Sequence, residues 1–121
     1  MKGCKKNMLS RYVVAALTVG MFSMVPVAYA LPKGGTSTTA TIKNASATQM
    51  NITGSTNNVI NWQSFSIANG EKVQFDTNNY LNLVRGTSKS EIDGNLSGGG
   101  NIYLINPNGI LFGTNARVNV G

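Results

Sequence analysis

A sharp corner between two short apolar strands constrains this chain more than any other feature of its sequence. Residues 101–105 and 110–112 alternate in a way that is typical of strands, and Asn106-Pro107-Asn108-Gly109 separates them. Each of the four suits its place in a type I turn. The side chain of Asn106 can hydrogen-bond to its own backbone, and Pro107 presets φ at the second position. Asn108 tolerates the bridge region at the third position, and Gly109 suits the fourth. The stretch predicts a strand, a turn and a second strand, which begins at Ile110.

Apolar residues recur at intervals of eight around this corner. One series comprises Ile102, Ile110 and Val118, and the other comprises Leu96, Leu104, Phe112 and Val120. Turn-forming residues fill the intervals. Short strands of equal length with corners between them favour a coil around a triangular core, a parallel β-helix with the second series pointing inward. An antiparallel meander with four-residue hairpin loops has the same spacing and stays open on this evidence.

The segments before residue 80 are less regular. Weak alternation over residues 40–53 predicts an early strand pair or a cap. Over residues 59–67 the apolar phase shifts by one residue between Trp62 and Phe65, which indicates a bulge or bend. Both aromatic residues are predicted to lie in the core or its cap rather than to hold a ligand. Residues 68–71, Ala-Asn-Gly-Glu, predict a turn.

Residues 1–30 carry the features of a Sec signal peptide. Four basic residues precede an apolar run over residues 12–28, which Thr, Gly, Ser and Pro interrupt. Ala28, Tyr29 and Ala30 then match the small-x-small rule of signal peptidase, so we expect cleavage between Ala30 and Leu31. The run is too interrupted for a membrane anchor. The sequence thus predicts that the Sec machinery and signal peptidase process this chain.

Most of the net charge and the single cysteine belong to the predicted signal peptide and would be lost on its removal. Of the formal charge of +6, +4 lies in residues 1–30, so the remainder carries +2 with scattered cations. Such scattering argues against nucleic-acid binding. Cys4 lies within the signal peptide, so the exported part has no thiol and no disulfide. Its stability must come from burial and backbone pairing.

No set of residues for catalysis is evident, and we expect no metal site, no cofactor and no enzymatic activity. The chain contains no histidine, and the exported part contains no cysteine. Gly98-Gly99-Gly100 lacks the helix and the Lys of a phosphate loop. Glu91 and Asp93 would share the outer face of a strand, where a solvated edge is the more frequent role of such a pair.

Three stretches together resemble a known family, the N-terminal two-partner-secretion (TPS) domains of the filamentous haemagglutinins. They are residues 81–86 (LNLVRG), 90–96 (SEIDGNL) and 101–113 (NIYLINPNGILFG), and residues 117–121 continue the match. Residues 60–67 resemble the family's Asn-Trp-x-x-Phe segment. The similarity covers nearly all of residues 40–121. The Asn-Pro-Asn-Gly-Ile motif flanked by strands is its specific part.

The resemblance implies a right-handed parallel β-helix over residues 31–121 that directs the secretion of a large exoprotein. The partner would be an outer-membrane β-barrel transporter of the Omp85 type in a Gram-negative bacterium, acting in the periplasm through its repeat domains. The exoprotein would be an adhesin or haemagglutinin, a haemolysin or a contact-dependent inhibition toxin. It would be secreted or displayed at the cell surface. Its downstream region would meet host or neighbouring cells.

The sequence departs from the family in two ways. The second motif, of Asn-Pro-Asn-Leu type, is not literally present, so only residues 106–110 are carried over as residues for transporter recognition or a structural turn. Domains of this family run to roughly twice this mature length, and the last predicted strand has no cap. We therefore expect a truncated or partial sequence. A second reading, the opening of a β-helical carbohydrate-active enzyme, would need clustered acidic and basic residues on one outward sheet.

Overall fold

The computed structural model describes residues 30–121, and this part of the chain is built from strands and corners. The strands are β1 (Thr41–Ser46), β2 (Gln49–Thr53), β3 (Asn57–Trp62), β4 (Lys72–Phe75), β5 (Asn79–Val84), β6 (Ser90–Ile92), β7 (Asn95–Ser97), β8 (Ile102–Ile105), β9 (Ile110–Phe112) and β10 (Arg117–Asn119). Ala28 and the rest of the predicted signal peptide before Ala30 lie outside the described residues. No helix in the described part is long and apolar enough to cross a membrane.

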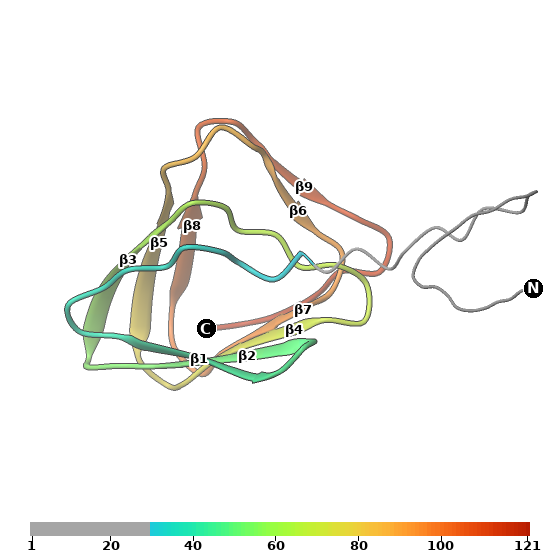
Figure 1. The fold of residues 1–121 in the computed structure, drawn as a ribbon. Coiled ribbons are helices and arrows are strands. Elements are labelled where there is room, and N and C mark those ends of the chain that lie inside the picture. The colour runs from blue at the N-terminus through green and yellow to red at the C-terminus, as the bar shows by residue number, and fades with distance from the viewer. Residues whose placement is uncertain (1–29) are drawn as a thin grey trace, which may run out of the picture.

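The strands form the three sides of a triangular coil, which Figure 1 shows nearly end-on. One side has the order β1-β2-β4-β7-β10, the second β3-β5-β8 and the third β6-β9. Beyond β1, neighbouring strands within each side are parallel. Crossover connections between parallel strands are right-handed. The predicted right-handed parallel β-helix is therefore confirmed, and the antiparallel meander is wrong.

The register shows that the number of residues in one full coil is nearly three times the eight-residue interval seen in the sequence. Asn57 pairs with Asn79 at an offset of 22 residues, and Ser90 pairs with Ile110 at an offset of 20. The eight-residue interval is instead the step from one side of the triangle to the next. Loops of unequal length at the corners change the number of residues per coil. The paired strands nevertheless place their inward side chains one above the other in successive coils.

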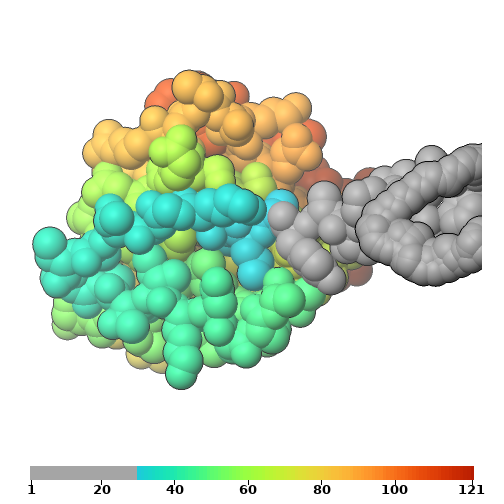
Figure 2. All heavy atoms as spheres, in the orientation of Figure 1, coloured from blue at the N-terminus to red at the C-terminus, as the bar shows by residue number. Residues whose placement is uncertain are grey.

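An antiparallel layer covers the first end of the coil. Strands β1 and β2 form a hairpin, which confirms the strand pair predicted over residues 40–53. Before it, Lys33 and Thr36 form antiparallel bridges with Ser64 and Asn61. Figure 2 shows this N-terminal segment in cyan, running across the surface above the green hairpin. The layer occupies strand edges that would otherwise be open to pairing.

The core is a stack of apolar side chains from all three sides. Its fully or nearly buried members are Met50, Ile52, Ile60, Trp62, Phe65, Ile67, Val73, Phe75, Tyr80, Val84, Ile92 and Leu96. The phase shift predicted between Trp62 and Phe65 is confirmed, because both rings are buried although they are three residues apart. The two rings pack edge to face with their centroids 5.4 Å apart. The turn predicted at residues 68–71 is also present, with Gly70 at a φ of 88°.

One amide lies within this apolar stack and binds the tryptophan. Asn82 is fully buried on β5, and its Oδ1 accepts a hydrogen bond of 2.8 Å from Trp62 Nε1. Its Nδ2 donates to the carbonyl of Tyr103 in the next coil at 3.1 Å. The amide therefore satisfies the indole N–H and links three successive strands of one side.

The last coil differs from the sequence prediction. Leu96 is buried and Leu104 is partly buried against the core, so the inward assignment is confirmed for these two. Phe112 and Val120 are exposed, and their predicted burial is wrong. Phe112 does stack in register on the buried Ile92, but no further coil covers it in the described chain. Val120 follows the end of β10 and lies outside the strand.

Candidate functional site

The corner at residues 106–110 joins β8 to β9, on the edge between two sides of the triangle (Figure 1). The N–H of Gly109 donates to the carbonyl of Asn106 at 3.0 Å, which closes a four-residue turn. Gly109 has a φ of 108°, a left-handed conformation that residues with a Cβ rarely adopt. Pro107 supplies the fixed φ of the first central position. The residue types therefore produce the turn locally.

The side chain of Asn106 is buried and uses its amide inside the fold. Its Nδ2 donates to Ser88 O and to Ser90 Oγ, both at 3.0 Å. Its Oδ1 accepts a hydrogen bond of 2.9 Å from the backbone N–H of Asn108. Both polar atoms of this amide are satisfied by protein partners. Asn106 thus fixes the turn and ties it to the loop before β6.

Asn108 and Gly109 add two more links to the preceding coil. The Nδ2 of Asn108 donates to the carbonyl of Gly86 at 2.8 Å, and the N–H of Ser90 donates to the carbonyl of Gly109 at 2.9 Å. The corner after β8 is therefore stacked on the corner after β5. Hydrogen bonds of this kind satisfy backbone groups where strands bend and the regular ladder is interrupted.

What the corner presents to solvent is mostly apolar or backbone. Pro107, Asn108, Gly109 and Ile110 are exposed, and Asn106 is not. On the strands beside them Tyr103, Ile105 and Leu111 are also exposed. Because Tyr103 pairs in register with Leu81, which pairs with Val59, an apolar column runs along the outer face of β3-β5-β8.

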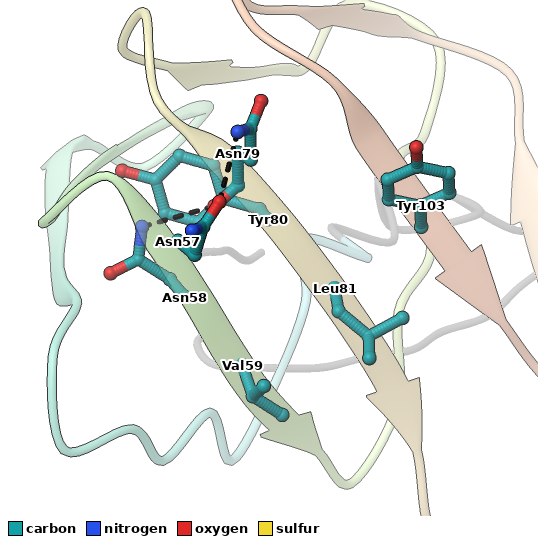
Figure 3. Close-up of a pocket in the computed structure, with 7 residues that line it drawn as sticks. All are labelled: Asn57, Asn58, Val59, Asn79, Tyr80, Leu81 and Tyr103. Atoms are coloured by element: carbon teal, nitrogen blue, oxygen red, sulfur yellow. Dashed lines mark hydrogen bonds between the residues drawn. The ribbon is translucent and has the colours of Figure 1, made fainter.

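A shallow hollow of about 400 Å³ lies along this column. Figure 3 shows Val59, Leu81 and Tyr103 along the three neighbouring strands, with the amides of Asn57 and Asn79 at one end. The Nδ2 of Asn79 donates to Oδ1 of Asn57 at 2.9 Å, and its own Oδ1 accepts from the N–H of Asn101 at 3.1 Å. These amides continue from coil to coil as a ladder.

Asp76 is a second corner residue, which the sequence analysis did not single out. Its carboxylate accepts hydrogen bonds from Tyr80 Oη at 2.7 Å, from the N–H of Asn78 at 2.9 Å and from the N–H of Gly54 at 3.0 Å. Desolvation raises the pKa of this carboxyl group, but the hydrogen bonds outweigh it and hold the pKa below its usual value. Burial and the bond to Asp76 raise the pKa of Tyr80. The Asp-Thr-Asn-Asn sequence after β4 was the available turn signal.

Glu91 and Asp93 have separate structural partners. Glu91 is exposed, and its carboxylate lies 3.9 Å from Lys89 Nζ. Asp93 accepts a hydrogen bond of 2.9 Å from the N–H of Asn115 in the following corner. Within residues 30–121 no group of three or more His, Cys, Asp or Glu side chains is placed to hold a metal ion.

Comparison with known proteins places this coil in a family. The model of the TPS secretion domain matches residues 28–121, and the chain belongs to this family. It is similar to the HMW1 secretion domain from Haemophilus influenzae, whose crystal structure matches with a TM-score of 0.66 and 30% identity. That match covers 72% of this chain and 25% of the other.

Two curated relatives bear the name heme/hemopexin-binding protein. One, from Haemophilus influenzae, is 38% identical over 87 residues, which are 68% of this chain and 9% of the relative. The other, from Haemophilus influenzae strain Rd, is 40% identical over 65 residues, which are 50% of this chain and 7% of the relative. The chain therefore spans less than a tenth of the length of these relatives. Proteins of this family are secreted by Gram-negative bacteria.

Proposed function

We propose that this chain is a non-enzymatic secretion-targeting module that directs a large exoprotein to a partner transporter in the outer membrane. The observation that carries the proposal is the family match over residues 28–121, together with a coil similar to a solved secretion domain. TPS domains engage a partner outer-membrane transporter. The carboxylates of Asp76 and Asp93 accept hydrogen bonds that hold corners of the coil.

The partner that we propose is a transporter of the Omp85 type, which would engage the domain through its periplasmic repeat domains. The exposed surface around the corner offers apolar groups for contact with such a partner. Pro107, Ile110 and Tyr103 present apolar groups, and the amide of Asn106 is turned inward. We therefore propose that residues 106–110 act on secretion mainly by shaping the corner.

The domain boundaries that we propose follow from the export route. Residues 1–30 would be the Sec signal peptide, and residues 31–121 the targeting domain, with cleavage after Ala30. The protein would pass through the periplasm before it reaches the medium or the cell surface. The exoprotein would be an adhesin or haemagglutinin, a haemolysin or a contact-dependent inhibition toxin that meets host or neighbouring cells.

A β-helical carbohydrate-active enzyme is the second candidate. Its supporting observation is the fold, since a β-helix can carry residues for catalysis on an outer side. The outer face of β3-β5-β8 carries apolar and amide side chains along its central columns. The first candidate is therefore favoured.

The experiment is a secretion assay in the bacterium that makes this protein. Export into the medium is measured with a candidate Omp85-type transporter gene of that bacterium intact, deleted and restored. We expect the protein to leave the medium and collect in the periplasm when the gene is deleted. Unchanged export without any such transporter would contradict the proposal. Hydrolysis or elimination of a polysaccharide by the purified exported protein would favour the enzyme.

A further inference from the structure

Glu71 is a buried carboxylate that the corner does not explain. Its side chain belongs to the turn at residues 68–71 before β4, and the residue is 2% exposed. Its Oε1 accepts a hydrogen bond of 2.8 Å from the N–H of Ala68. A glutamate at this place is not needed to close the turn, because the N–H of Glu71 itself donates to the carbonyl of Ala68 at 3.0 Å.

No cation accompanies this carboxylate in the part of the chain that the structure describes. The ion pair found over residues 30–121 joins Lys89 and Glu91, which are both largely exposed. Buried charges in proteins are normally paired with an opposite charge, because an isolated one loses its hydration without compensation. The Glu71 carboxylate is therefore buried without an opposite charge from residues 30–121.

The missing partner is indicated by the other hydrogen bonds of Glu71. The backbone N–H of Ala30 donates to Oε1 at 3.2 Å and to Oε2 at 3.1 Å. The peptide N–H of Ala30 thus faces both oxygens of the buried carboxylate. Downstream, Pro32 is buried and Lys33 bridges to Ser64, so the segment is held against the coil at this point.

We propose that the Glu71 carboxylate is the binding site for the α-ammonium group that signal peptidase creates on Leu31. The inference rests on the proposed function, since it requires cleavage after Ala30. Cleavage removes the neutral N–H of Ala30 and leaves a charged amino group one residue further on. Consecutive Cα atoms are about 3.8 Å apart, so a small movement brings this group to the same oxygens. The ion pair fastens the N-terminal layer over the first end of the coil.

An order of events follows from this geometry. Leu31 packs partly against the core and Pro32 is buried, so the bond between Ala30 and Leu31 lies against the folded coil. A peptidase needs its substrate segment free of such contacts. Cleavage therefore precedes the docking of residues 31–36, and the ion pair forms only in the processed protein.

The test measures how fast the α-amino group of the native protein reacts with an acylating reagent. Protein is collected from the medium and, in parallel, from the periplasm, and its first residue is identified by mass spectrometry. Acetylation of the Leu31 amine is then followed against acetylation of the exposed Lys43 as an internal standard. The variants are Glu71→Gln and, as the matched control on an exposed glutamate, Glu91→Gln.

We expect the Leu31 amine to react at least about tenfold more slowly in the wild type than in Glu71→Gln, because a nearby opposite charge favours the protonated amine by a pKa unit or more. Glu91→Gln should match the wild type. Equal rates in the wild type and Glu71→Gln would overturn the inference. If Glu71→Gln is not recovered, the wild type is compared before and after unfolding in urea, and a native rate within about twofold of the unfolded rate overturns it equally.

Failure of the proposed function produces a different result. Loss of transporter dependence changes where the protein is found and leaves the amine reactivity unaffected, because the periplasmic sample is measured as well. A protein that begins at Leu31 and has a freely reactive amine contradicts only the role of Glu71. A processed protein that begins at another residue contradicts the cleavage site and this inference with it.

Discussion

The middle and the last coil contain the same inward columns but bury them very differently. Ile92 is 0% exposed, whereas Phe112, which stacks on it one coil later, is 59% exposed. Leu96 is 5% exposed, and Val118 in the same column is 47% exposed. The residue types are comparable and the register is continuous. Burial in a β-helix therefore depends on having a packed layer on both sides, as it does in other repeat folds.

The first end achieves this with an antiparallel layer rather than another coil. The hairpin of β1 and β2 and the bridges of Lys33 and Thr36 cover it. Glu71 binds the start of this layer. The following substitutions test the contrast between the covered and uncovered ends, in order of decreasing expected effect on the free energy of unfolding.

The largest effect is expected in the inward column that Ile92 and Phe112 share, where each of the two side chains is truncated in turn. Ile92→Ala should lower the free energy of unfolding by about 2–5 kcal/mol, because it opens a cavity in a fully packed site. Phe112→Ala in the same 121-residue chain should cost less than about 1 kcal/mol, since most of its surface already contacts water. Urea unfolding of both variants measures the difference. Equal costs would show that the two levels are equivalently packed.

Removal of the buried amide should have the next largest effect. Asn82→Leu leaves Trp62 Nε1 without its acceptor in the middle of the core, and a buried unsatisfied donor costs about 1–3 kcal/mol. Asn57→Leu, on the outer amide ladder of the same side, is the matched control and should cost less. The two unfolding midpoints in urea provide the comparison. A stabilised Asn82→Leu variant would contradict a structural role for this hydrogen bond.

Acid should lower the free energy of unfolding through the corner at Asp76. The folded-state pKa of Asp76 lies below the ordinary value of 3.8, so the carboxylate stabilises the fold fully above the unfolded-state pKa. This contribution is lost as the pH falls below about 3.8 and through the folded-state pKa. Asp76→Asn should lower stability at neutral pH by roughly 1 kcal/mol, the typical net value of a hydrogen bond. Its stability should also fall less steeply in acid, which unfolding from pH 7 to pH 2 measures. Parallel pH profiles would refute the assignment.

The smallest effect is expected at the exposed ion pair. Lys89 and Glu91 are separated by 3.9 Å, and their side chains are 54% and 62% exposed. Pairs of this kind contribute about 0–1 kcal/mol because water and salt screen them. Lys89→Ala should therefore leave the thermal midpoint nearly unchanged at any salt concentration. A clear drop that disappears in high salt would show a stronger pair than the geometry indicates.

The local features of this fold could be predicted from the sequence. Three such features are the turn at residues 68–71, the hairpin over residues 40–53 and the phase shift after Trp62. They depend on neighbouring residues, whose propensities and alternation can be read from the sequence. The recurrence of strands and corners favoured the parallel coil but left the antiparallel meander open. The same locality explains the corner at residues 106–109, where each residue type fits its own backbone conformation.

Stacking between coils could not be predicted in the same way. The partners of Asn82, Asp76 and Glu71 lie between 2 and 41 residues away, and the offset between coils varies from 20 to 25. A local pattern contains no information on which polar side chain meets which backbone group at such separations. The exposure of Phe112 was missed for the same reason, since its apolar character shows its column and not whether a coil covers it.

The central claim is that residues 106–110 serve secretion by forming the corner, and one double substitution tests it most directly. Asn106→Ala with Asn108→Ala removes the hydrogen bonds to Ser88, Ser90 and Gly86. Thermal stability and circular dichroism of the purified protein are recorded beside its secretion with the transporter present. We predict that stability and secretion fall together. Secretion that fails while stability and circular dichroism stay unchanged would contradict the claim and would assign these asparagines to direct contact with the transporter.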